Sequence, residues 1–359
     1  MVRMLLAGDR FIRNDLLEEA ILDQPGVTPT FERIELPWPQ VPYGAVAEVD
    51  EASGSEDAVV AAIGEAEVVV TQMAPLTARV LASAPKLRLI VCTRGGPVNI
   101  NLEAATKGRV AVSCTPGRNA VAAAEYALLL MMAAMRRLPQ VHNETMAGRW
   151  RSDLYDYDEC GREVAGSTVG VVGLGEIGRR LAGMLAAMGA TVIAHDPYLD
   201  QAPDGIELVG LDALLERSDA ITLHARLTSE SRGMIGPAEL ARLRPDAVLV
   251  NTARGGLLDY DAALAALDAG SLGALALDVY AKEPIPAGSP LLTHDRVVVS
   301  PHLAGATRPT AHRAIAIAAA EVGRHLRGEA MLHVVNGVDG VDGRRPSGAG
   351  GQAAARSPE

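Results

Sequence analysis

Short apolar runs recur along the chain, separated by longer segments in which the apolar residues have helical spacing. Continuous runs of Val, Ile and Leu of this length are typical of parallel strands that are buried on both faces. The runs cover residues 68–70, 89–91, 169–172, 191–194, 220–223, 247–250 and 297–299. Their alternation with helices predicts an α/β fold built on doubly wound parallel sheets.

Two such sheets are expected, each in its own domain. The first occupies residues 1–118, after which Pro116-Gly117 interrupts the chain before a long helix that begins near Asn119. The second sheet runs from about 169 to 299, and a last helix at about 309–326 should pack on the first domain. The predicted domains are therefore residues 1–118 with 303–336, and residues 119–302. The cleft between them is the expected site.

Composition narrows the class of protein. The 359 residues are 48% hydrophobic and 21% charged, and the formal charge of −11 argues against nucleic acid as a ligand. The three cysteines have no metal-ligand spacing, so we expect no metal site and a reducing, cytoplasmic setting. The apolar stretch 120–135 contains Glu125 and is too short to span a bilayer, and the N-terminus resembles no export signal. Residues 337–359, rich in Gly, Ala, Ser and Arg, should be disordered.

A glycine fingerprint follows the run at 169–172. Gly173 permits a tight turn, Gly175 lets the backbone approach a pyrophosphate, and Gly178 allows the next helix to pack closely on the strand. The N–H groups of that helix would face the phosphates. Asp196 ends the next run, where an acid accepts from the adenosine ribose hydroxyls and repels a 2′-phosphate. This context predicts a site for NAD rather than NADP.

An arginine, a carboxylate and a histidine follow in order behind this site. Arg254 comes directly after a predicted strand, where its guanidinium could bind a carboxylate in a bidentate manner. His302 has the intrinsic pKa of a proton relay, and Glu283 would orient its ring and favour the imidazolium. Each residue alone is more often structural, but the order of all three behind a dinucleotide site predicts hydride transfer on a carboxylate substrate. Asp278, which ends another apolar run, could hold the nicotinamide carboxamide.

These motifs resemble those of the D-isomer-specific 2-hydroxyacid dehydrogenases. The resemblance covers about residues 65–336, and its motifs lie at 172–178, 195–198, 251–255, 276–280 and 301–305. It implies that Arg254, Glu283 and His302 are catalytic. It implies contacts to NAD from Gly175, Glu176, Ile177, Asp196, Thr252, Asp278 and Gly305. It also implies a homodimer formed largely by the cofactor domains, with a contribution from the helix near 119–135.

Two segments depart from the family pattern. The glycine turn at 93–101 is shorter than usual and ends in Asn, and Arg226 stands where a proline is usual. The turn, with Gly95 and Gly96, should offer N–H groups to the substrate carboxylate. Arg94 resembles the arginine that begins this loop in phosphoglycerate dehydrogenases, and Arg10 could converge on the same cleft. A second cationic site would suit a substrate with a phosphate or phosphonate. The alternative is that both arginines pair with nearby acids.

Several functions remain compatible with the sequence. The leading interpretation is an NAD-dependent dehydrogenase that interconverts a D-2-hydroxy acid and its 2-oxo acid. Its substrate is either a phosphorylated acid such as 3-phosphoglycerate or, as an alternative, glyoxylate or hydroxypyruvate. A formate or phosphite dehydrogenase is a further enzymatic alternative. A non-catalytic NAD(H)-sensing partner protein on the same fold is an alternative from another class, because such proteins can retain the Arg, Glu and His. Turnover separates it from the enzymes.

Overall fold

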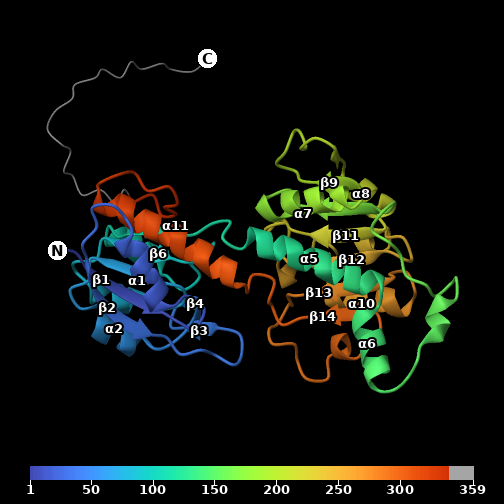
Figure 1. Ribbon diagram of the computed structural model, residues 1–359, viewed down its shortest axis with the longest axis horizontal. Helices are drawn as coiled ribbons and strands as arrows, with labels where there is room; N and C mark the ends of the chain where they lie inside the picture. Colours follow the sequence, from blue (N-terminus) through green and yellow to red (C-terminus); the bar gives the residue numbers. More distant parts are fainter. Residues whose placement is uncertain (339–359) are drawn as a thin grey trace, which may run out of the picture. The chain divides into compact units, whose positions relative to one another are not determined.

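The computed structural model describes residues 1–338 as two compact units (Figure 1). The first contains residues 1–38, 43–116 and 314–338. The second contains residues 39–42 and 117–313. The predicted tail at 337–359 lies, from residue 339 on, outside the described residues.

A five-stranded parallel sheet forms the centre of the first unit. Its order, β2-β1-β5-β6-β7, is the doubly wound 2-1-3-4-5 arrangement when the strands are numbered within the sheet. The strands are β1 (Arg3–Gly8), β2 (Thr30–Glu35), β5 (Val68–Thr71), β6 (Leu89–Cys92) and β7 (Ala111–Ser113). β1, β5, β6 and β7 are almost entirely buried, which is why they appear in the sequence as continuous apolar runs.

Helices and one hairpin complete this unit. The helices are α1 (Asn14–Leu22), α2 (Glu56–Ile63), α3 (Ala78–Ala82), α4 (Leu102–Lys107) and the larger part of α11 (Arg308–Leu326). The hairpin consists of β3 (Gly44–Val46) and β4 (Val49–Ala52). Glu321 of α11 is 1% exposed, and its carboxylate accepts from the Ser113 hydroxyl and from the backbone N–H groups of Leu332 and His333. These bonds attach the C-terminal segment to edge strand β7.

The second unit contains a seven-stranded parallel sheet in the order β10-β9-β8-β11-β12-β13-β14. This is the 3-2-1-4-5-6 order of a dinucleotide-binding fold with one strand added. The strands are β8 (Thr168–Val172), β9 (Thr191–His195), β10 (Glu207–Leu208), β11 (Ala220–Leu223), β12 (Val248–Asn251), β13 (Ala274–Leu277) and β14 (Val297–Val299). The strand order reverses between β8 and β11, which is where ligands of such sheets bind.

Helices cover both faces of this sheet. Its helical elements are α5 (Ala120–Met135), α6 (Leu138–Met146), η1 (Ser152–Tyr155), α7 (Glu176–Ala187), α8 (Leu211–Arg217), α9 (Pro237–Leu240), η2 (Gly255–Leu257), α10 (Tyr260–Asp268) and η3 (Pro290–Leu292). One core contains α5 and α7 with Val248 and Val250 of β12. The other contains α8, α9 and α10 with Leu249. Alternate residues of one strand therefore enter opposite cores, as a sheet covered on both faces requires.

The observed strands agree with the predicted apolar runs to within one residue at most ends, so the prediction of two doubly wound parallel sheets is confirmed. The division into units differs from the predicted domain limits in residues 39–42, 117–118 and 303–313, all of which belong to the second unit. The largest of these differences is at residues 303–313. The reason is local: Leu303 and Ala304 are bonded to Asp278, and Arg313 donates to the carbonyl of Arg118.

Candidate active site

The turn between β8 and α7 has the geometry that its glycines predicted. Gly173 has φ +93°, a conformation that disfavours any side chain, and α7 begins at Glu176 with Gly175 as its N-cap. A Cβ on Gly178 would lie 2.0 Å from the carbonyl oxygen of Gly173, so the helix packs directly on the turn. A Cβ on Gly175 would meet no atom within 4 Å, so the space beside this backbone is open. The turn can therefore hold a phosphate against the N-terminus of α7.

Two polar side chains beside this turn suit a dinucleotide. Asp196, just after β9, accepts from the N–H of Leu174 at 2.8 Å and from the N–H of Tyr198 at 3.1 Å. Its carboxylate is therefore fixed against the glycine turn, as a ribose acceptor needs to be. The buried hydroxyl of Thr252 has no hydrogen-bond partner among the described residues. A buried hydroxyl without a partner is costly, so this atom supports the presence of a ligand in the site.

Arg254 is presented by a turn that Asn251 fixes at the end of β12. The fully buried Asn251 side chain donates to the Arg254 carbonyl at 3.0 Å and accepts from the N–H of Ala253 at 3.1 Å. The exposed guanidinium of Arg254 bonds to the Ala253 carbonyl, and no carboxylate pairs with it within residues 1–338. This cation is thus available to an anionic ligand.

Glu283 and His302 form a direct pair near this arginine. Oε2 of Glu283 lies 2.8 Å from Nδ1 of His302, and Oε1 accepts from the N–H of Tyr280 at 3.1 Å. His302 has φ +55°, the left-handed conformation that non-glycine residues seldom adopt. Half of its side chain is exposed, so its second ring nitrogen can reach a ligand. A strained backbone at such a paired histidine is typical of a functional site.

The two partners shift one another's pKa. The hydrogen bond to Glu283 raises the pKa of His302 above its usual value, and although burial opposes this effect, the charges of Glu283 and Asp278 add to it. Burial favours the neutral acid at Glu283, but the bond and charge of His302, with the N–H of Tyr280, lower the pKa of this carboxyl below its usual value. Both shifts favour the imidazolium–carboxylate pair.

Asp278 is completely buried at the end of β13. Its carboxylate accepts from the Ser300 hydroxyl at 2.7 Å and from the N–H groups of Leu303 and Ala304, both at 2.8 Å. These bonds enclose His302, so Asp278 fixes the loop that carries it. Gly305 follows this loop, and a Cβ there would lie 3.1 Å from the side-chain nitrogen of Asn119.

The remaining predicted residues belong to the first unit. Arg94, just after β6, forms an ion pair with Glu51 of the β3–β4 hairpin at 2.9 Å. Burial raises the pKa of Tyr43 to about 12, the charges of Asp9 and Glu51 add to this effect, and the charge of Arg94 opposes it. Arg94 is therefore set among acids at the carboxyl edge of the first sheet. A Cβ on Gly95 or Gly96 would meet nothing within 4 Å, so packing within the unit does not require these glycines.

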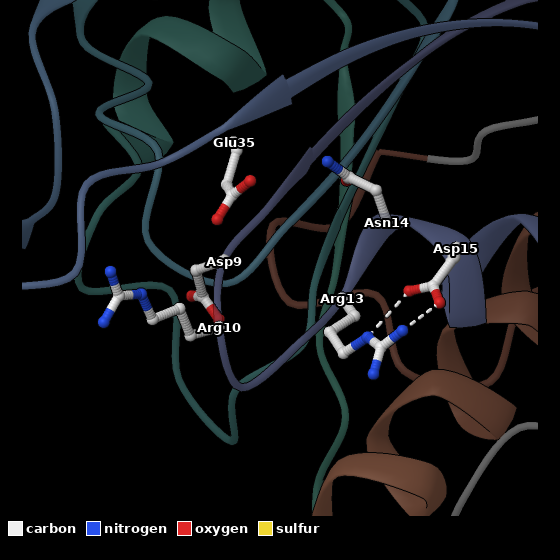
Figure 2. Close-up of a pocket in the computed structure, with 6 residues that line it drawn as sticks. All are labelled: Asp9, Arg10, Arg13, Asn14, Asp15 and Glu35. Atoms are coloured by element: carbon white, nitrogen blue, oxygen red, sulfur yellow. Dashed lines mark hydrogen bonds and ion pairs between the residues drawn. The ribbon is translucent and has the colours of Figure 1, made fainter.

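Arg10 lines a shallow cavity of about 340 Å³ after β1 (Figure 2). Asp9, Arg13, Asn14, Asp15 and Glu35 line it as well. Arg13 is bound to Asp15, whereas Arg10 is exposed and forms no hydrogen bond or ion pair with the described residues. Its neighbours Asp9 and Glu35 are acidic, which makes this cavity a poor phosphate site.

Known proteins resemble the chain in both sequence and structure. The family model "D-isomer specific 2-hydroxyacid dehydrogenase, NAD binding domain" matches residues 128–304. A glyoxylate reductase from Korarchaeum cryptofilum is 35% identical over 80% of this chain and 88% of its own length. The chain belongs to the D-isomer specific 2-hydroxyacid dehydrogenase family. Its predicted cofactor, NAD, is confirmed at the level of the family, because the matched model is that family's NAD binding domain.

Other family members are similar to more limited extents. A D-3-phosphoglycerate dehydrogenase from Mycobacterium tuberculosis is 40% identical over 79% of this chain and 54% of its own length. The chain thus spans about half the length of the curated phosphoglycerate dehydrogenases that it matches. The NAD-dependent formate dehydrogenase from Staphylococcus aureus, solved in complex with NAD, has a TM-score of 0.75 and 25% identity over 95% of this chain and all of its own.

The structure gathers most of the predicted residues but also adds others. Glu283 and His302 are in contact, and Arg254 and Asp278 act on the charge of His302. Glu176, Ile177 and Gly178 form the first turn of α7, after Gly173 and Gly175. Sequence reasoning did not find the supporting residues Asn251, Tyr280 and Ser300, nor Glu51. Asn251 and Tyr280 lie within the motifs at 251–255 and 276–280, but the motifs do not show their supporting roles, which depend on contacts formed in the fold.

Proposed function

We propose that the protein is an NAD-dependent oxidoreductase that interconverts a D-2-hydroxy acid and its 2-oxo acid. The observation that carries the proposal is the 2.8 Å pair of Glu283 and His302. Both follow strands of the sheet that also presents Arg254, which has no carboxylate partner within residues 1–338. All of these residues follow strands at the carboxyl edge, where doubly wound sheets bind their ligands. Family membership agrees with this chemistry.

NAD fits the glycine turn by three observations of the structure. The space beside Gly175 is open, Asp196 is fixed against the turn, and the Thr252 hydroxyl is buried without a partner. The N–H groups at the start of α7, including those of Glu176 and Ile177, would bind the pyrophosphate. Asp278 and Gly305 would lie on the nicotinamide side. When bound, the reduced cofactor supplies the hydride.

The side chains of the trio supply binding and proton transfer. Arg254 would bind the substrate carboxylate and polarise the adjacent carbonyl. Because Glu283 occupies Nδ1 of His302, Nε2 is the nitrogen left to exchange a proton with the substrate oxygen. In the reductive direction His302 must begin as the imidazolium, which Glu283 stabilises.

The proposal is tested by following NADH oxidation against a panel of 2-oxo acids with and without a phosphate group. We expect turnover on at least one 2-oxo acid, and its loss in an Arg254→Ala variant that still binds NADH. In a parallel assay of NAD+ reduction, turnover of formate or phosphite, without turnover of any 2-oxo acid, would move the function to another reaction on this fold. Tight NADH binding without turnover of any member would favour the NAD(H)-sensing partner protein.

Recognition of a phosphate or phosphonate group on the substrate would depend on the guanidinium of Arg94. We propose that a phosphate or phosphonate would bind Arg94 only in competition with Glu51, and that Arg10 contributes little because Asp9 and Glu35 lie beside it. The 2.9 Å ion pair already neutralises the guanidinium, and Arg94 is only 22% exposed. A small unphosphorylated acid, such as glyoxylate or hydroxypyruvate, needs no second cation and is therefore the favoured substrate class.

Glu51→Gln is expected to lower KM for a phosphorylated 2-oxo acid about 10-fold, because it removes the charge that competes for Arg94. KM for an unphosphorylated acid should not change. Asp50→Asn is the matched control, since Asp50 is an exposed acid on the same strand and makes no contact with Arg94. An equal effect of both substitutions, or none from Glu51→Gln, would contradict a phosphate site at Arg94.

We further propose a cytoplasmic homodimer formed by the second unit. Large apolar side chains are exposed along α6 and the segment after it, including Met146, Trp150, Tyr155 and Tyr157. Surfaces of this kind are typical of interfaces. The helix α5 also exposes Leu129. Sedimentation equilibrium should return twice the chain mass.

The buried free thiols of Cys92 and Cys114 fit a reducing compartment. No helix within residues 1–338 is both long and apolar enough to cross a membrane.

A further inference from the structure

The side chain of Tyr280 lies between the ends of β13 and β14. It is 8% exposed, and its hydroxyl donates to the Ser300 carbonyl at 2.8 Å while accepting from the N–H of Ser300 at 3.1 Å. The Leu277 carbonyl is also 3.1 Å from this hydroxyl. Ser300 stands two residues before His302, so the tyrosine hydroxyl restrains the start of the loop that carries the histidine.

The backbone of Tyr280 supports the other two members of the trio. Its N–H donates to Oε1 of Glu283 at 3.1 Å, leaving Oε2 for His302. Its carbonyl oxygen packs against Gly255, the residue after Arg254, so closely that a Cβ on this glycine would lie 1.9 Å away. Tyr280 thus contacts Glu283 directly, and it contacts Arg254 and His302 through their near neighbours in the sequence, Gly255 and Ser300.

We propose that Tyr280 is a positioning residue for the reaction, whose hydroxyl holds the His302 loop at the distance at which His302 and Glu283 form their hydrogen bond. This inference rests on the proposed function of the trio. Because His302 has the left-handed backbone conformation, its loop needs external restraint. Asp278 supplies that restraint on the far side of His302 through Leu303 and Ala304. On the near side, Tyr280 holds the backbone of Ser300, and Asp278 accepts from the Ser300 hydroxyl.

Tyr280 does not itself transfer a proton. Burial raises the pKa of its hydroxyl far above the usual value, and the charges of Asp278 and Glu283 add to this, so the group stays protonated. The charged groups that face His302 are Glu283, Asp278 and Arg254. A change of the Tyr280 side chain therefore acts on His302 through distance and orientation and leaves this set of charges intact.

Tyr280→Phe tests the role of the hydroxyl, because it keeps the ring and the backbone contacts. Tyr260→Phe is the matched control. The two rings are 6.5 Å apart, and the Tyr260 hydroxyl donates to the Val279 carbonyl at 2.8 Å. It also interacts with the side chain of Asn251, on the Arg254 side of the site, but makes no bond to the His302 loop among the described residues, so it is a control for the pKa of His302. For both variants and the wild type, NMR titration gives the pKa of His302, and kinetics give kcat, KM and the Kd of NADH.

In Tyr280→Phe we expect kcat to fall about 10-fold with an unchanged Kd for NADH, since misplaced catalytic groups lower turnover without loss of cofactor contacts. The pKa of His302 should fall toward its ordinary value as the bond to Glu283 loosens, whereas Tyr260→Phe should leave that pKa at its wild-type value. A lower stability with wild-type kcat and wild-type pKa in Tyr280→Phe would overturn the proposal, as would equal pKa changes in both variants. If the wild type reduces no 2-oxo acid, the proposed function fails, and the titration alone decides whether Tyr280 positions His302.

Discussion

A His302→Asn variant should lose about 10²–10⁴-fold in kcat for reduction of a 2-oxo acid while binding NADH as tightly as the wild type. Asparagine preserves a polar side chain and tolerates a left-handed backbone, so the loop can remain folded. It cannot carry the proton that the imidazolium supplies. Steady-state kinetics with an NADH titration by fluorescence measure both quantities.

The same histidine determines the expected pH dependence. Because the pKa of His302 is raised and reduction requires its protonated form, kcat/KM for reduction should be constant at low pH and fall as pH rises through that raised pKa. In Glu283→Gln the partner is neutral, so the pKa falls and the declining limb moves to lower pH. A control, His294→Asn, should keep the wild-type profile, since His294 lies beside Asp268 and outside the trio. If His302→Asn retained the same declining limb, another group would be the proton donor.

Gly178→Ala should lower the free energy of unfolding of the second unit by about 3 kcal/mol and abolish tight NADH binding. The new Cβ would stand 2.0 Å from the Gly173 carbonyl oxygen, and backbone cannot yield as a flexible side chain can. α7 would have to move away from the glycine turn, which would displace the N–H groups that face the pyrophosphate. Urea denaturation and NADH fluorescence measure the two effects.

Gly183→Ala is the matched control on the same helix. A Cβ at Gly183 would meet nothing within 4 Å, so alanine should raise stability by up to about 1 kcal/mol through its higher helix propensity. NADH binding should be unchanged. Equal stability of the two variants would show that α7 is not packed on the turn at Gly178.

The predicted parts of the fold are those that local sequence determines. Except for the two-residue edge strand β10, the strands of the second unit are largely apolar runs, and the turn at Gly173 needs glycine whatever surrounds it. β2 was not predicted, because it is half exposed at the edge of its sheet and has a mixed polar pattern. The β3–β4 hairpin also lacks an apolar run, so its residue Glu51 could not be paired with Arg94 in advance.

The candidate site also has parts that local sequence predicts and parts that it does not. Arg254, Glu283 and His302 were found because each follows a recognisable strand or motif. The bonds that orient them were not found. The three hydrogen bonds accepted by Asp278 and those between the Tyr280 hydroxyl and Ser300 join segments about 20 residues apart or more through irregular loops. Loops carry no periodicity, so sequence names the chemical groups at such a site more readily than the bonds that orient them.

The hydrogen bond between Glu321 and Ser113 has a consequence for folding during synthesis on the ribosome. The two residues are 208 positions apart, and residues 117–313 of the second unit are synthesised between them. At about 5–20 residues per second, roughly 10–40 s pass before Glu321 follows Ser113 out of the exit tunnel. During this delay edge strand β7 lacks the segment that later bonds to it, and an uncovered edge invites pairing with other chains. The nascent chain is therefore most in need of a chaperone before α11 and the segment that follows it emerge.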